Sequence, residues 1–279
     1  MRLGGPIFGD VSTPEKWAAR VKAAGYGAAY APVLDGATPD MISGYVEAAR
    51  RAGIVIAEVG AWSNPLGPDA AQSRKALELN KARLALAEGL GARCCVNITG
   101  SRGERWDGPH PLNLTRETFD LIVATVREII DAVKPTRTFY TLETMPWMYP
   151  DSVDSYARLI RAIDRTAFAV HFDPANLVAS PQRYFATGEL IREFVAKLGP
   201  HIRSCHGKDV RLSAKLTTHI DEVRPGLGGM DYAAYLRALD GLDPDVPLML
   251  EHLPNEEEYA AAAAHVRSVA ASVGVSLRA

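Results

Sequence analysis

The chain has 279 residues, a formal net charge of -2 and 47% hydrophobic residues, which is ordinary for a globular protein with a large core. The near-neutral charge gives no attraction to nucleic acid or to an anionic membrane surface. No apolar run reaches the roughly 18 residues that a membrane-spanning helix needs. The N-terminus MRLGGPIFGD lacks the pattern of a secretion signal, so we expect a cytoplasmic protein.

Short apolar runs typical of β-strands alternate with segments whose apolar residues recur at helical spacing. The strand-like runs lie at residues 2–8, 27–33, 54–61, 94–98, 138–144, 167–173, 202–208 and 247–252. The helical segments lie at residues 13–24, 39–52, 70–90, 115–133, 152–163, 183–198, 231–239 and 256–273. This alternation predicts an α/β fold, a single (β/α)8 TIM barrel that spans residues 1–279. The rival, an open doubly wound sheet, would carry a glycine-rich phosphate loop after its first strand, and GGPIFGD does not match one.

Four polar residues stand at the ends of the last four strand-like runs: Glu143 in TFYTLET, Asp173 in AFAVHFDP, His206 in IRSCHGKD and Glu251 in VPLMLEH. Taken alone, each of the acids would more often cap a helix or pair with an arginine. Because the carboxyl ends of barrel strands meet on one face, we expect the four side chains to converge there. Burying three carboxylates requires a counter-charge. Three carboxylates and one imidazole suit a divalent metal ion, for which we expect Mn2+ first, with Mg2+ or Co2+ as alternatives.

The motifs LETMP, HFDPANL, CHGKD, RPGLGGMDY and LEH resemble those of the xylose isomerase-like TIM-barrel superfamily. This superfamily contains sugar isomerases and epimerases, inosose dehydratase and apurinic endonuclease family 2. The resemblance covers nearly the whole chain and is densest between Leu142 and Leu253. It implies a metal-dependent enzyme, and it implies that the metal ligands are Glu143, Asp173, His206 and Glu251.

The chain departs from two branches of that superfamily. For the endonuclease branch, the resemblance implies a trinuclear zinc site that needs additional histidines. The runs EVGAW and CCVNI of this chain contain no histidine. Asn176 stands three residues after Asp173, where those relatives and the ketose 3-epimerases have histidine. We therefore expect no nucleic-acid partner, in agreement with the absence of a basic surplus. The run HGKD, with Lys208 and Asp209, looks more like the inosose dehydratase side of the superfamily.

Such ligands suit the removal of a proton next to a carbonyl, because a cation on the carbonyl and the adjacent hydroxyl stabilises the enediolate. Glu143 and Glu251 would lie on opposite sides of the cation, so that one removes the proton and the other returns it. The sequence therefore predicts a metal-dependent sugar or cyclitol isomerase or epimerase. The alternative is a lyase, either a dehydratase or an eliminating deglycosidase, that acts on a keto-sugar, a keto-inositol or an oxidised glycoside.

Further residues are candidates for contact with the carbohydrate or cyclitol substrate: His171, Lys208, Arg224, Trp62, Trp147 and His219. His171 would bind a hydroxyl or orient a metal ligand, and ordinary burial is the alternative. Lys208 would bind a substrate oxygen, or instead pair with a ligand carboxylate. Arg224 and His219 lie in a late loop, where solvated charges are the alternative. The two tryptophans follow strand-like runs on the side of the site, and indole packs well against the C–H faces of sugars.

Two long polar stretches follow the fourth and the seventh strand-like runs, at residues 100–113 and 210–229. We expect the first to form a lid or a collar around the substrate, with a surface excursion as the alternative. We expect the second to be irregular and to close over the metal. A homo-oligomer, or an accessory subunit that completes the pocket, stays an open alternative.

Overall fold

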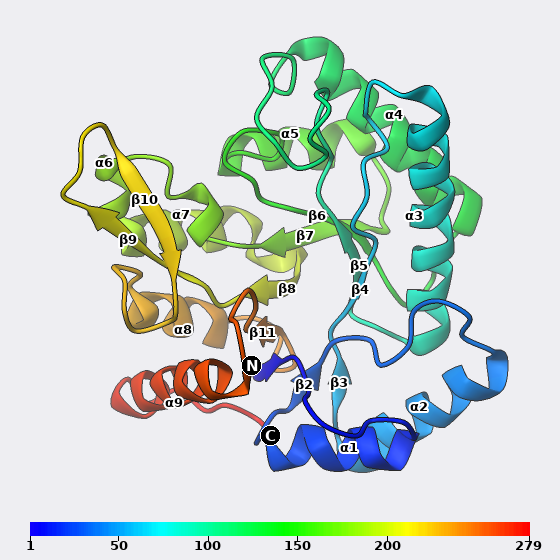
Figure 1. Cartoon of the computed structure of the whole chain (residues 1–279), viewed down its shortest axis with the longest axis vertical. Helices are drawn as coiled ribbons and strands as arrows, with labels where there is room; N and C mark the ends of the chain where they lie inside the picture. Colours follow the sequence, from blue (N-terminus) through cyan, green and yellow to red (C-terminus); the bar gives the residue numbers. More distant parts are fainter.

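The computed structural model describes residues 1–279 and contains the alternation of strands and helices that the sequence predicts (Figure 1). The strands of the barrel are β1 (Arg2–Gly5), β2 (Ala28–Ala29), β3 (Val55–Ile56), β4 (Glu58–Gly60), β5 (Cys94–Asn97), β6 (Tyr140–Glu143), β7 (Phe168–Phe172), β8 (Ile202–His206) and β11 (Pro247–Met249). The helices are α1 (Pro14–Ala23), α2 (Pro39–Ala52), α3 (Ala70–Leu90), α4 (Arg116–Val133), α5 (Val153–Ile163), α6 (Pro181–Tyr184), α7 (Thr187–Leu198), α8 (Tyr232–Asp240) and α9 (Glu256–Ser272). None of them is long and apolar enough to cross a membrane.

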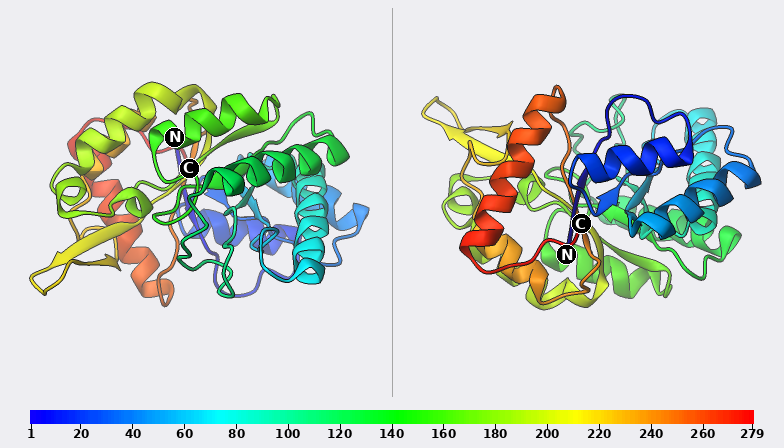
Figure 2. Two further views of the ribbon diagram at one scale, coloured as in Figure 1. Left: turned by 90° about the horizontal axis from the view of Figure 1, so that it is seen from above. Right: turned by 90° about the horizontal axis from the view of Figure 1, so that it is seen from below.

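The strands form one parallel barrel. Hydrogen bonds connect them in the order β3-β2-β1-β11-β8-β7-β6-β5-β4. β3 and β4 are two halves of one strand, separated by Ala57. The amide of Ala57 donates a hydrogen bond to the carbonyl of Ala29 on one side, and its carbonyl accepts one from the amide of Cys94 on the other. The two ends of the row therefore meet, and the helices surround the strands (Figure 2). The prediction of a single TIM barrel is confirmed.

Side-chain and glycine caps fix where the helices begin and end. The hydroxyl oxygens of Thr13, Thr38 and Thr115 accept hydrogen bonds from backbone amides three residues later, at the first turns of α1, α2 and α4. Gly53 and Gly91 end α2 and α3 in the left-handed conformation, with φ of 66° and 64°. Because each glycine cap lies just before a strand, these residues also set where β3 and β5 enter the barrel.

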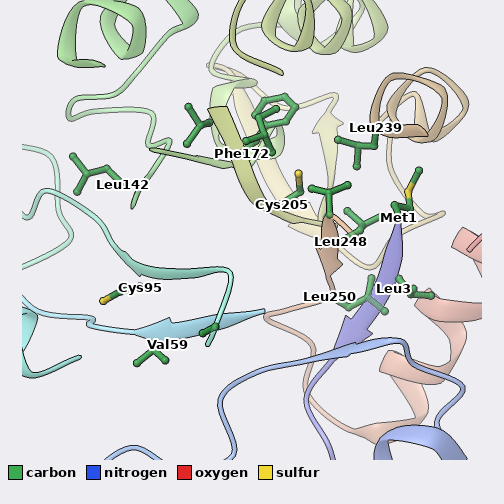
Figure 3. Close-up of a cluster of buried hydrophobic side chains, with 14 of the residues drawn as sticks. Met1, Leu3, Val59, Cys95, Leu142, Phe172, Cys205, Leu239, Leu248 and Leu250 are labelled. Atoms are coloured by element: carbon green, nitrogen blue, oxygen red, sulfur yellow. The ribbon is translucent and has the colours of Figure 1, made fainter. Parts of the chain in front are cut away.

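Large apolar side chains fill the layer between the strands and the helices. Figure 3 places Leu248 of β11 and Cys205 of β8 close to Leu239 of α8, and all three belong to one buried cluster. Strand residues alternate between the two faces, so the neighbours of these side chains in sequence point into the barrel. His206 and Met249 are therefore interior residues, and both are fully buried. This alternation supplies the interior positions at which polar strand-end residues can meet.

A β-hairpin follows β8 and takes up most of the stretch 210–229 that we expected to be irregular. Its strands are β9 (Asp209–Ser213) and β10 (His219–Val223), which pair antiparallel and extend away from the barrel (Figure 1). The expectation of an irregular loop was wrong, because one side chain holds the hairpin together although the local composition is typical of a loop. The carboxylate of Asp209 accepts hydrogen bonds of 2.8 to 3.0 Å from four backbone amides at the base of the hairpin, those of Val210, Gly226, Gly228 and Met230.

Candidate metal centre

Four side chains converge at the carboxyl ends of four adjacent strands. Glu143 ends β6, Asp173 follows β7, His206 ends β8, and Glu251 lies just beyond β11. One oxygen or nitrogen atom from each lies within 4.8 Å of the others. The Nδ1 atom of His206 lies 2.8 Å from Glu251 Oε1, 3.2 Å from Glu143 Oε1 and 3.6 Å from Asp173 Oδ2. The structure therefore brings together the four residues that the sequence analysis proposed as ligands.

Hydrogen bonds orient two of the carboxylates in this cluster. Asp173 Oδ1 accepts the backbone amides of Ala175 at 2.9 Å and Asn176 at 3.3 Å, while Asp173 Oδ2 faces the other ligands. The side-chain amide of Asn176 donates to Glu143 Oε1 at 3.0 Å. Asn176, which stands where we noted a missing histidine, therefore holds both acids in place.

Lys208 brings a positive charge into the same cluster. Its Nζ atom lies 2.9 Å from Asp173 Oδ2 and 3.5 Å from Glu143 Oε1, and it also contacts Glu251. Burial acts to lower the pKa of Lys208, but the three carboxylates hold that pKa well above its usual value. Burial acts to raise the pKa of Glu251, but His206 and Lys208 bring it down to about 2. Lys208 thus pairs with the ligand carboxylates, which was the alternative to a substrate contact.

Charge and unsatisfied oxygen atoms make this cluster a fit for a divalent cation. Asp173 Oδ2 and Glu251 Oε1 are buried and have no aligned hydrogen-bond donor, although Lys208 Nζ is near both. The three carboxylates and the one ammonium leave a formal charge of two negatives when His206 is neutral. Oxygen ligands with a single imidazole are the donor set that Mn2+ and Mg2+ accept. The four ligands would hold such an ion between them.

A further ionisable residue, Glu58 of β4, lies next to this cluster and was missed by the sequence analysis. Its carboxylate lies 2.9 Å from His171 Nε2 and 3.4 Å from His206 Nε2, and it accepts the hydroxyl of Ser204. His171 is fully buried, so the structure places it inside the barrel beside Glu58 and away from the surface where a substrate would enter. The available signal was one acid within the apolar run IVIAEVGA, since a charge in a buried strand needs partners.

A sequence model of the xylose isomerase-like TIM-barrel family matches residues 18–269 of this chain. The chain belongs to this family. No curated protein sequence gives a significant match. The resemblance that the motifs indicated is therefore confirmed at the level of the family.

Solved structures with the xylose isomerase-like fold match nearly the whole chain at low identity. D-psicose 3-epimerase from Clostridium cellulolyticum is 14% identical with a TM-score of 0.70, covering 99% of this chain and 100% of that chain. Endonuclease IV from Thermus thermophilus is 14% identical with a TM-score of 0.72, covering 98% and 100%. A xylose isomerase-like protein from Mycobacterium smegmatis in complex with magnesium is 17% identical with a TM-score of 0.64, covering 94% and 91%. Because an epimerase and an endonuclease match equally well, these likenesses establish the fold and leave the reaction to the site.

Within this xylose isomerase-like barrel, a cavity of about 480 Å³ lies beside the ligand cluster. Trp147 from the loop after β6, Asn176 from the turn after β7, and Ile220 and Glu222 from β10 contribute to its lining. The indole nitrogen of Trp147 donates to the carbonyl of Asp107 at 2.8 Å, so the stretch 100–113 also reaches this face of the barrel. Trp147 is thus the predicted substrate contact that the structure places at the cavity.

Three other predicted substrate contacts, Trp62, Arg224 and His219, are not among the residues that line this cavity. Trp62 is 43% exposed, and its indole lies against Gly60. Arg224 donates to the carboxylate of Glu258 on α9 at 2.9 Å, so its charge is already paired. His219 neighbours Ile220 on β10, and the alternation of a strand turns it to the face of the hairpin that does not line the cavity. Neither Arg224 nor His219 therefore lines this cavity, and whether they contact a substrate stays a prediction.

Proposed function

We propose that this chain is a divalent-metal-dependent isomerase or epimerase of a sugar or cyclitol. The observation that carries the proposal is the convergence of three acids and His206, with two buried acceptor oxygens left without an aligned donor. The likeness to an epimerase whose structure was solved with D-tagatose, and to a family protein solved with magnesium, supports the choice of sugar chemistry and of a hard cation. Mn2+ is the proposed ion, with Mg2+ and Co2+ as alternatives.

Glu143 and Glu251 are the proposed proton-transfer residues. The bound cation would stabilise the negative charge that develops when a proton leaves the carbon next to a carbonyl. The two glutamates come from the outer pair of the four adjacent strands, so they can approach a substrate from opposite sides. One would take the proton and the other would return it, which moves a carbonyl or inverts a stereocentre. Asn176 orients Glu143, while Lys208 pairs with Glu251.

The cavity beside the cluster favours an uncharged polyhydroxy substrate. No lysine or arginine lines it, and its charged lining residue is Glu222. A phosphate group would find no lysine or arginine in this lining to bind it, and it would meet the carboxylate of Glu222. The indole of Trp147 offers a surface for C–H groups, and Asn176 and Glu222 offer partners for hydroxyl groups.

The test is removal and restoration of the metal, followed by product analysis. After a chelator has removed the metal, the protein should lose its activity on a panel of ketoses and keto-inositols, and added Mn2+ should restore that activity. Mn2+ at about 100 times its Kd should also stabilise the fold by about 2.7 kcal/mol, read as a rise in melting temperature. Isomeric products support the proposal, whereas release of water or of an aglycone would assign the lyase reaction, which shares the same first step.

A pair of histidine variants provides the matched control. His206→Ala removes the single nitrogen ligand of the proposed set, whereas His219→Ala removes a histidine of the hairpin that lies outside that set. The first variant should lose tight Mn2+ binding and remain folded, and the second should bind Mn2+ like the wild type. An unchanged melting temperature and turnover after verified metal removal would overturn the proposal.

A further inference from the structure

The carboxylate of Glu58 lies on the far side of His206 from the three proposed acidic ligands. His206 turns Nδ1 toward Glu143, Asp173 and Glu251, and it turns Nε2 toward Glu58 Oε2 at 3.4 Å. Both residues are buried, with exposed fractions of 0% for His206 and 2% for Glu58. No solvent therefore competes for the contact between them.

An imidazole can bind a cation through one nitrogen only while that nitrogen carries no proton. In the neutral ring the proton must then be on the other nitrogen, and a carboxylate that accepts it fixes both the tautomer and the orientation of the ring. For Nδ1 of His206 to face a cation, the proton has to be on Nε2. Glu58 is the acceptor that the fold places at that nitrogen.

We infer that Glu58 is a positioning residue for the metal centre: it accepts the Nε2 proton of His206 and thereby leaves Nδ1 as the ligand atom. This inference rests on the metal site proposed above. Glu58 also accepts the Nε2 proton of His171, whose ring packs edge-on against the ring of His206 with centroids 4.2 Å apart. One carboxylate thus holds both rings, which explains why His171 is buried although it does not reach the cavity.

A second metal ion is the competing explanation, because ligand atoms of Glu58, His171 and His206 also lie close together. The hydrogen bonds argue against it. Glu58 Oε1 already accepts from His171 and from the hydroxyl of Ser204, and Oε2 faces His206. A carboxylate that is already occupied by three donors serves orientation better than ligation.

The variant Glu58→Gln tests the inference, with Ser204→Ala as its matched control. The glutamine amide can donate to Nε2 of His206, which would drive the ring proton onto Nδ1 and block the ligand atom. We expect the Kd for Mn2+, measured by the electron paramagnetic resonance of free Mn2+, to rise about 10- to 100-fold. Ser204→Ala removes another donor to the same carboxylate but leaves its contact with His206, so its Kd should stay within about threefold of the wild type.

A measurement on the wild type keeps the test independent of whether the glutamine variant folds. In the Mg2+-loaded protein, the imidazole nitrogen shifts of His206 should show the proton on Nε2, and a proton on Nδ1 would overturn the inference. Equal Mn2+ affinity in Glu58→Gln and wild type, an equal loss in Ser204→Ala, or two ions per chain in the wild type would also overturn it. If the wild type binds no Mn2+ at all, the proposed function fails together with this inference.

Discussion

The two halves of the barrel differ in what their strands turn inward. The first strands contribute small residues, Gly4 of β1, Ala28 of β2 and Ala57 between β3 and β4, and Met249 packs against them. The strands from β6 to β11, and the residues that directly follow them, contribute three acids together with His206 and Lys208. Glu58 of β4 also points inward, but its partners His171 and His206 belong to the second half. Apart from Glu58, the first half is thus specified by close packing, and the second half by charges that need one another. Substitutions in the two halves should therefore fail in different ways.

The largest effect should come from removing a base in the charged half. In Glu143→Gln and Glu251→Gln the amide oxygen can still coordinate a cation, but it cannot accept a proton from carbon. Turnover should fall by at least about a hundredfold in each variant, with bound metal retained. Exchange of the substrate hydrogen with solvent should stop in the variant that lacks the abstracting base and persist in the other. Normal turnover in both metal-loaded variants would refute proton transfer by these carboxylates.

An intermediate effect, on folding alone, should come from the packed half. A Cβ atom at Gly4 would lie 2.5 Å from the carbonyl oxygen of Ala28 and 2.6 Å from the sulfur of Met249. Gly4→Ala should lower the free energy of unfolding by about 1–3 kcal/mol, measured by urea denaturation, because an overfilled interior must shift. Its Mn2+ affinity should match the wild type, since the ligands come from the other half.

The control for this variant is Gly89→Ala in α3, where the added Cβ would meet Ile42 at an ordinary 3.6 Å. That variant should be neutral or slightly more stable, because alanine favours a helix. Equal destabilisation of the two variants would show that the barrel interior is no tighter than its surroundings.

The smallest effect should come from an acid at the opposite end of the barrel from the metal centre. Burial acts to raise the pKa of Glu88, but hydrogen bonds from Thr136, Arg137 and Thr138 lower it to about 2. A carboxyl whose pKa is depressed by folding stabilises the fold above its unfolded pKa, and this contribution is lost as the pH falls through the folded pKa. Glu88→Gln should therefore cost about 0.5–1.5 kcal/mol at pH 7.

The difference between Glu88→Gln and the wild type should shrink as the pH falls from 4.5 toward 2, measured by denaturation at each pH. A difference that stays constant over this range would show that the ionised state of Glu88 does not contribute. Metal affinity at neutral pH should be unaffected, in contrast to the acids of the charged half.

The fold and the four proposed ligands were predictable from sequence because barrel topology restricts where polar strand ends can go. Glu143, Asp173 and Glu251 each close an apolar run, and parallel strands in a barrel deliver their carboxyl ends to one face. The family match confirms the barrel, and the distances confirm that the side chains meet. Their role as metal ligands remains a prediction.

The features that the sequence did not predict depend on contacts between residues that are distant in sequence. Arg224 pairs with Glu258 on α9, and nothing in the local sequence indicates that contact. Glu58 is visible in the sequence as an acid in an apolar run, but its donors come from β7 and β8. The hairpin was missed because Asp209 orders it through backbone amides up to 21 residues away.

Because Asp209 holds the base of the hairpin, we expect the hairpin to tolerate changes in length with little effect on the rest of the fold. The cost of closing a flexible loop grows only slowly, by about 0.6 kcal/mol for each doubling of its length. Residues between 210 and 226 can therefore be added, removed or exchanged while the same carboxylate holds the base and β8 and α8 keep their positions. Because Thr218, Ile220 and Glu222 of this segment line the cavity, we expect substrate preference to diverge here while the proposed metal ligands stay unchanged.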